Sequence, residues 1–203
     1  MRLALSIAVA FSLFAGFSAR TIKDPAVLQA EVSSEEYAVY DAAIAKTFAQ
    51  RAVHQLGIIS PTVDIAEIFM DLRPFGISNE AEDIKFWKSR FQNIKQLTME
   101  DYLANSKRKS VLKRSFKHGL DYVIRESPAQ LKSGVSPETG KPWRDDDCVV
   151  ELSRVGFDRE HEQALLYLTY IYRTRRGEGF FLFLAKADNQ WTVAEVERVW
   201  VPD

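Results

Sequence analysis

One stretch decides the fold: CVVELSRVGFDREHEQALLYLTYIYRTRRGEGFFLFLAKADNQWTVAEVERVWV, residues 148–201. In it, runs rich in valine, leucine, tyrosine and phenylalanine are separated by short clusters of turn residues. This pattern predicts four consecutive β-strands joined by tight turns. Strands that follow one another through short connections pair as antiparallel neighbours, so we expect a four-stranded antiparallel meander.

The central strands of this meander carry apolar side chains on both faces, over residues 163–173 and again over 180–185. Such strands are covered on both sides. Asp188-Asn189 predicts a two-residue hairpin turn, because both residues tolerate the required backbone angles. The apolar parity changes within the last strand, which predicts a β-bulge near Ala194-Glu195.

The residues before the sheet favour helices that would cover it. Ser33 and Glu36 have the spacing of a capping box, and an apolar stripe follows, so we expect a helix over 34–56. Two shorter helices are expected downstream. Asn79 is positioned to cap the first of them and Thr98 to cap the second.

The remaining segments are less regular. Ile58–Ile65 is rich in β-formers but contains Pro61, so we expect an edge strand at best. Leu120–Arg125 is also rich in β-formers, and residues 127–147 form a loop-rich segment with several prolines and glycines. Residues 20–203 are therefore expected to form a single α+β domain in which N-terminal helices pack on the C-terminal meander.

The first 19 residues have the composition of a secretory signal peptide. One arginine precedes an apolar run over Leu3–Phe17, and small residues follow where a peptidase would cut, after Ser18 or Ala19. The run is shorter than the about 20 residues that cross a bilayer, although an uncleaved membrane anchor is the alternative. We expect removal of residues 1–19, no transmembrane segment afterwards, and a secreted or periplasmic protein.

Composition excludes some classes of function. The net charge is −1, or −2 after loss of the signal segment, so nucleic acid is not expected as a partner. The 46% content of hydrophobic residues is enough to build a core. Cys148 is the only cysteine, which excludes an intrachain disulfide. We expect a buried thiol; a reactive thiol or an intermolecular disulfide is the alternative.

The sheet stretch resembles a family of exported bacterial proteins that has no assigned function. The similarity lies in ELSRVGFDREHEQALLYL (151–168), in GEGFFLFLAKADNQWTV (177–193), in the closing VWV (199–201) and in the helix start at Glu36–Tyr40. That family contributes no catalytic residues. More remotely, helices followed by a curved antiparallel sheet are similar to cystatin-like or NTF2-like domains, in which a cavity can form between helix and sheet. The latter likeness concerns the fold, which does not fix a function.

No catalytic or metal motif is evident. The three histidines, His54, His118 and His161, lack metal-ligand spacing, so we expect neither a metal nor a cofactor. His161 falls in a predicted hairpin turn, where a solvated tip is the simplest interpretation. Ser153 lacks the glycine-flanked context of a hydrolase nucleophile.

Three residues are candidates for binding a ligand: Arg154, Tyr170 and Glu178. An arginine among apolar residues needs a carboxylate, for which we expect Glu151, Glu178 or Glu197, or else an anionic ligand. The many aromatic residues of the sheet either pack in the core or line an apolar cavity.

The segment Lys107–His118 interleaves basic residues with Val111, Leu112 and Phe116. If it is helical, Leu112 and Phe116 share a face. Either it is a solvated segment with snorkelling lysines, or it binds an anionic surface such as lipid headgroups.

These observations favour an exported, non-enzymatic binding or interaction module, whose partner is a protein or a small apolar or anionic ligand. Two alternatives stay open. One is a small cavity-type enzyme, hydrolase-like, that uses Asp121, Arg154 and Glu178. The other is an inhibitor or immunity-like protein of the cell envelope.

Overall fold

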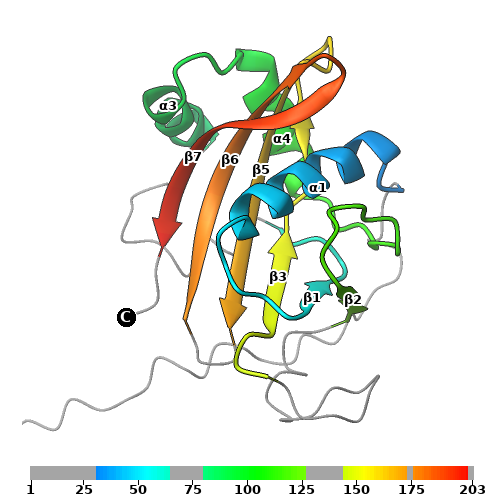
Figure 1. The fold of residues 1–203 in the computed structure, drawn as a ribbon. Helices are drawn as coiled ribbons and strands as arrows, with labels where there is room; N and C mark the ends of the chain where they lie inside the picture. The colour runs from blue at the N-terminus through cyan, green and yellow to red at the C-terminus, as the bar shows by residue number, and fades with distance from the viewer. Residues whose placement is uncertain (1–30, 65–79, 127–143, 173–175, 201–203) are drawn as a thin grey trace, which may run out of the picture.

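The structure is a computed structural model, and it describes residues 31–64, 80–126, 144–172 and 176–200. These residues form a mixed seven-stranded sheet with α1 on one face and α3 and α4 on the other (Figure 1). In chain order the elements are α1 (Ser34–Phe48), β1 (Leu56–Ile59), α3 (Glu80–Arg90), α4 (Gln96–Ser106), β2 (Tyr122–Arg125), β3 (Cys148–Leu152), β4 (Gly156–Phe157), β5 (Gln163–Tyr172), β6 (Gly177–Ala187) and β7 (Gln190–Trp200).

The sheet is larger than the predicted one. Its order is β2-β1-β3-β5-β6-β7, and β4 pairs with β5 off this path. The α+β class is confirmed, but a four-stranded antiparallel meander is wrong, because β1 and β2 extend the sheet and β1 pairs in parallel with both β2 and β3. Parallel pairing requires segments that are distant in sequence, and no local pattern indicates it.

The prediction of an edge strand at Ile58–Ile65 is also wrong. The strand is β1, its four residues are buried, and it lies between two neighbours. Pro61 follows the end of β1 at Ile59, so the missing amide hydrogen of proline removes no bond of the ladder.

Helix α1 begins as predicted and ends early. The capping box is present, since Glu36 N donates to Ser33 Oγ at 3.1 Å and Ser33 N donates to Glu36 Oε2 at 2.9 Å. The helix ends at Phe48 instead of residue 56. Leu56, which continues the helical stripe in the sequence, is the first residue of β1 and pairs with Tyr122 and Cys148.

The first of the four predicted strands is interrupted. β3 ends at Leu152, and β4 resumes pairing with β5 at Gly156. Further on, the turn at Asp188-Asn189 is confirmed, with positive φ values of 50° and 59°. The bulge is confirmed as well, because Glu195 pairs with Phe183 and Val193 pairs with Leu184, which leaves Ala194 without a partner in the ladder.

Two hydrophobic cores result, one on each face of the sheet. α1 covers the face with Leu166 and Leu168, while α3 and α4 cover the face with Tyr167 and Phe181. The predicted coverage of both faces of the central strands is thus confirmed, since β5 is buried along most of its length. Cys148 is buried in the first core as a free thiol, and burial raises its pKa.

The helix that Thr98 was expected to cap is α4, whose N-cap lies three residues earlier. Lys95 is the N-cap, and Thr98 is buried inside the helix, with its hydroxyl 3.3 Å from Gln163 Oε1. The Asn79 cap, the signal segment 1–19 and residues 127–143 of the loop-rich segment lie outside the described residues. Among the helices that the structure describes, none is long and apolar enough to cross a membrane.

Helix α3 carries a carboxylate in an unfavourable place. Asp83 Oδ1 is buried and accepts no hydrogen bond from the part of the chain that the structure describes. Burial, and after it repulsion from Glu80 and Glu82, raises the pKa of Asp83 from 3.8 to about 6. The ionised form of this side chain therefore destabilises the folded state.

We expect the Asp83→Asn variant to be more stable than the wild type at neutral pH, by about 1 kcal/mol after allowance for the partial exposure of the side chain. The folded pKa lies above the unfolded value of 3.8, so the penalty of the wild type grows as pH rises from 3.8 to about 6 and is complete above it. Urea denaturation across this range checks the prediction. A stabilisation of the same size below pH 3.8 would contradict it.

Candidate binding cleft

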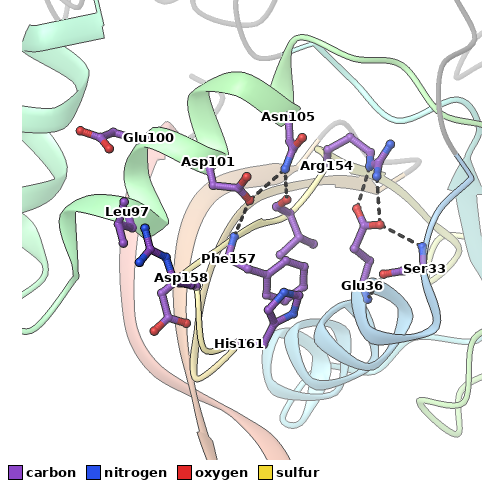
Figure 2. Close-up of a pocket in the computed structure, with 12 residues that line it drawn as sticks. Ser33, Glu36, Leu97, Glu100, Asp101, Asn105, Arg154, Phe157, Asp158 and His161 are labelled. Carbon is purple, nitrogen blue, oxygen red and sulfur yellow. Dashed lines mark hydrogen bonds and ion pairs between the residues drawn. The ribbon is translucent and has the colours of Figure 1, made fainter.

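A cleft of about 570 Å³ opens where the start of α1, one face of α4 and residues 154–161 meet (Figure 2). The helices contribute Ser33 and Glu36 from α1 and Leu97, Glu100, Asp101 and Asn105 from α4. The segment 154–161 contains β4 and the turn that leads into β5. Three segments that are distant in sequence therefore converge at the same place.

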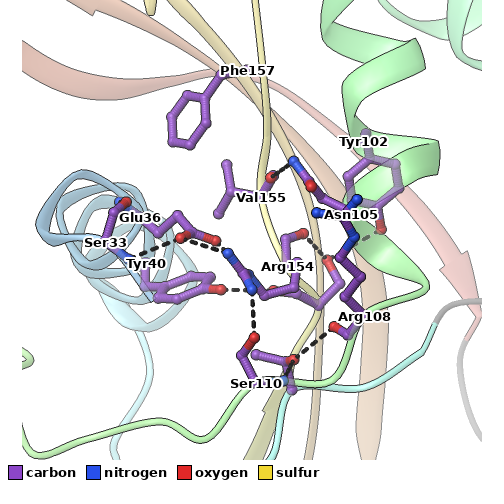
Figure 3. A network of polar contacts seen from close by, with 12 residues as sticks. Ser33, Glu36, Tyr40, Tyr102, Asn105, Arg108, Ser110, Arg154, Val155 and Phe157 are labelled. Carbon is purple, nitrogen blue, oxygen red and sulfur yellow. Dashed lines mark hydrogen bonds and ion pairs between the residues drawn. The ribbon is translucent and has the colours of Figure 1, made fainter. Parts of the chain in front are cut away.

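A buried ion pair closes one side of the cleft. Arg154 Nε and Nη2 donate to the two carboxylate oxygens of Glu36 at 2.6 and 3.0 Å, and Nη1 donates to Ser110 Oγ (Figure 3). The Arg154 and Glu36 residues are only 7% and 4% exposed. The guanidinium is thus neutralised within the protein, so a structural role explains its burial.

The expectation that Arg154 needs a carboxylate is confirmed, but the three expected partners are wrong. Glu178 and Glu197 pair with other arginines. Arg154 does not lie within a strand, because the chain leaves the ladder with β5 between Leu152 and Gly156. The partner is Glu36, 118 positions earlier in the chain, and Glu36 is also the second residue of the capping box.

Ser153 is a structural junction. Its hydroxyl donates to Arg154 O at 2.8 Å and accepts from Tyr102 Oη at 3.1 Å and Tyr167 N at 2.9 Å. The Tyr40 hydroxyl, from the opposite face of the sheet, donates to Ser153 O at 2.9 Å. The hydroxyl hydrogen is committed to a carbonyl and no histidine contacts it, so this arrangement does not support a serine nucleophile.

The wall formed by α4 carries carboxylates. Asp101 Oδ2 accepts from Phe157 N at 2.8 Å and from Asn105 Nδ2 at 2.9 Å. Glu100 is exposed, and its hydrogen bond comes from the neutral Gln96 side chain at 2.8 Å. Among the residues that the structure describes, no basic side chain pairs with either carboxylate. The cleft therefore presents negative charge along α4.

The opposite wall is the turn between β4 and β5. Although burial raises the pKa of Asp158, the Lys95 ammonium at 2.5 Å and two backbone amides outweigh it and hold that pKa below its usual value. The Phe157 and His161 rings stack with centroids 4.8 Å apart. His161 is exposed as expected of a hairpin tip, but its Nδ1 also contacts Glu35 at 2.8 Å.

Apolar surface completes the cleft. Leu97 is 44% exposed at its mouth, one of three large hydrophobic residues with this degree of exposure in the described part of the chain. Val155 and the stacked Phe157 ring line it as well. A ligand here would meet an apolar surface next to carboxylates.

Tyr170 and Glu178 lie together in a different cluster. The Tyr170 hydroxyl donates to Glu178, which also accepts from Arg51 Nη2 at 2.7 Å and Arg198 Nη1 at 3.1 Å. The Arg51 guanidinium lies 4.9 Å from the centroid of the Tyr170 ring. Burial raises the pKa of Glu178, but the hydrogen bonds from Tyr170 and Arg198 and the charge of Arg51 outweigh it, so the net shift is downward.

The sequence candidates are thus divided between two places. Arg154 lines the cleft and shares no hydrogen bond with Tyr170 or Glu178. Asp121, the third residue of the hydrolase-like alternative, is exposed, and its backbone carbonyl oxygen accepts a hydrogen bond from Leu56 N. In the described ranges no three potential metal-ligating side chains gather.

Sequence reasoning missed the residues that α4 contributes. Leu97, Asp101 and Asn105 are spaced four apart, which places them on one helix face. The expected start at Thr98 excluded Leu97 and so concealed this row.

Comparisons of this chain with protein-family models, with curated proteins and with solved structures found no match. The resemblance to exported bacterial proteins and to cystatin-like domains therefore stays a prediction.

Proposed function

We propose that the protein is a non-enzymatic binding module and that the cleft is its ligand site. One observation carries the proposal: the polar groups deep in the cleft are satisfied by one another, while Asp101 and Glu100 face it without a described cationic partner, beside the exposed Leu97. Catalysis requires a nucleophile or an acid–base pair that is free to react. A ligand site combines apolar surface with a few placed polar or charged groups, and the cleft offers both.

The ligand class follows from the unpaired charges. Asp101 and Glu100 favour an ammonium or guanidinium group, and Leu97 with the Phe157 ring favours an apolar body attached to it. Arg159, exposed at the cleft and without a described ion pair, disfavours a cation close to it. We therefore propose an organic cation with an apolar body. If residues 1–19 direct export, this binding takes place outside the cytoplasm.

Benzylammonium is a suitable probe, with benzyl alcohol and benzoate as its neutral and anionic counterparts. In a titration followed by ¹H–¹⁵N NMR, we expect benzylammonium to bind most tightly and to shift the amides of Asp101 and Phe157. Asp101→Asn should weaken binding about tenfold, since it removes a partly buried charged partner. Glu100→Gln should weaken it by about twofold to fivefold, as is typical of an exposed charge.

Two variants serve as controls. Arg159→Gln should strengthen binding by about twofold, because it removes a positive charge from the cleft. Glu126→Gln removes an equally exposed carboxylate that does not line the cleft, and it should leave the affinity unchanged. Tighter binding of benzoate than of benzylammonium would overturn the ligand class, and turnover in an esterase, phosphatase or peptidase panel would overturn the non-enzymatic function.

A further inference from the structure

A second feature lies on the α1 side of the molecule. Residues 107–118, here called the basic strap, connect α4 towards β2 and run beside α1 (Figure 1). The strap is not a helix, which corrects the helical arrangement considered from the sequence. Leu112 and Phe116 nevertheless both pack in the core, as anchors of an extended chain.

The body of the protein fixes the backbone of the strap at several points. Leu112 N donates to Ser60 Oγ at 2.9 Å. Lys113 N donates to Tyr37 Oη at 2.6 Å, and Lys117 N donates to Asp41 Oδ1 at 2.7 Å. The Phe116 and Tyr37 rings pack edge-on, with centroids 5.1 Å apart. Because the backbone is already fixed, the exposed side chains can be used for binding without ordering the chain first.

The strap concentrates positive charge. It carries six basic side chains besides His118: Lys107, Arg108, Lys109, Lys113, Arg114 and Lys117. Glu80, Glu31 and Asp41 are among the described carboxylates that contact it. Residues 107–118 contain no acidic residue, so the strap has a formal charge of +6, whereas the whole chain has −1. Such an asymmetry is typical of a surface that meets a negatively charged partner.

An apolar residue stands among these charges. Val111 is 49% exposed, although its neighbours Ser110 and Leu112 are buried. The aromatic residues of the strap region are engaged, since Phe116 packs against Tyr37 and Tyr122. Proteins bind single-stranded nucleic acids through exposed aromatic rings that stack on the bases. The strap has no such exposed ring. Dispersed cations around one aliphatic residue instead suit a lipid surface, where the cations contact headgroups and the aliphatic side chain enters the interface.

We propose that the basic strap docks the protein on an anionic lipid surface. The proposal is independent of the cleft and of its ligand. Each lysine or arginine near an anionic bilayer strengthens binding by roughly fivefold. The attraction acts within about one Debye length, so salt weakens it.

Flotation with lipid vesicles tests the proposal. We expect the protein to bind vesicles of equal parts phosphatidylcholine and phosphatidylglycerol, to ignore phosphatidylcholine alone, and to be released by added sodium chloride. The triple variant Arg108→Gln, Arg114→Gln, Lys117→Gln removes three exposed cations whose charged groups form no ion pair with a described carboxylate. It should bind roughly a hundredfold more weakly. Val111→Asn should weaken binding severalfold without a change in charge.

The matched control is Lys46→Gln, Lys85→Gln, Lys88→Gln, which removes three exposed cations from α1 and α3. Its net charge equals that of the strap variant, and we expect it to bind vesicles like the wild type. An equal loss in both variants would overturn the strap as the docking site. Binding to heparin or to single-stranded DNA with no binding to anionic vesicles would overturn the lipid surface as the partner.

Discussion

Replacement of Arg154 by methionine is expected to lower the free energy of unfolding by about 3–5 kcal/mol. The Glu36 carboxylate would remain almost fully buried without the guanidinium that neutralises it. Ser110 Oγ would lose its contact with Arg154 as well. Chemical denaturation of the purified variant measures the change.

A double variant separates the ion pair from the packing of the side chain. In Glu36→Gln, Arg154→Met both charges are absent, while the glutamine can still accept the capping hydrogen bond from Ser33 N. We expect this variant to regain most of the lost stability, because an unpaired buried charge is the main cost.

The surface pair of Arg90 and Glu197 offers a matched control. Its side chains are 51% and 26% exposed, so Arg90→Met should cost less than about 1 kcal/mol. Arg154→Met with an equally small cost would contradict the structural role of the buried pair. If Arg154→Met lowered the affinity for benzylammonium but not the stability, Arg154 would be a ligand contact instead.

Replacement of Gly156 by alanine is the second change with a large expected effect. A Cβ atom at this position would lie 2.3 Å from the backbone N and Cα of Tyr102 in α4, whereas real Cβ atoms essentially never come closer than 3.0 Å. The obstacle is the backbone of a packed helix, which a rotamer change cannot relieve. We expect a loss of about 3 kcal/mol, the upper end for overpacking.

The variant should also disturb the cleft, because α4 must move away from β4. The Asp101–Phe157 hydrogen bond of 2.8 Å would lengthen, and Trp87, which packs edge-on against Tyr102 at 5.2 Å, would change its near-ultraviolet circular dichroism. Gly119→Ala is the control: no atom lies within 4 Å of its Cβ position, and its φ of +81° costs about 1 kcal/mol. Equal losses in the two variants would contradict the close contact.

The parts of the fold that depend on neighbours in sequence could be predicted. The Asp188-Asn189 turn, the bulge at Ala194 and the Ser33 capping box each rest on residues a few positions apart, and the structure confirms them. Pairing across the chain could not be predicted in this way. Leu56 continues the stripe of α1 and equally suits a buried strand, and its strand partners lie 66 and 92 positions later.

The candidate cleft could be predicted only in part, because it too depends on contacts between segments that are distant in sequence. The prediction that Arg154 pairs with a carboxylate was correct, because any buried arginine needs a partner for its charge, whatever the fold. The identity of the carboxylate depended on the interruption of the strand at Ser153, which no local pattern indicates. The charges of α4 were visible in the sequence, but their place beside β4 depends on the tertiary packing around Gly156.

The parallel position of β1 affects how the protein is made. β1 is synthesised long before β3, and α3 and α4 are synthesised before β5 and β6, the strands that cover their apolar faces. The nascent chain therefore exposes the apolar faces of these helices until β5 and β6 are synthesised. Exposed apolar surface favours aggregation, so we expect chaperones to bind the chain during this time.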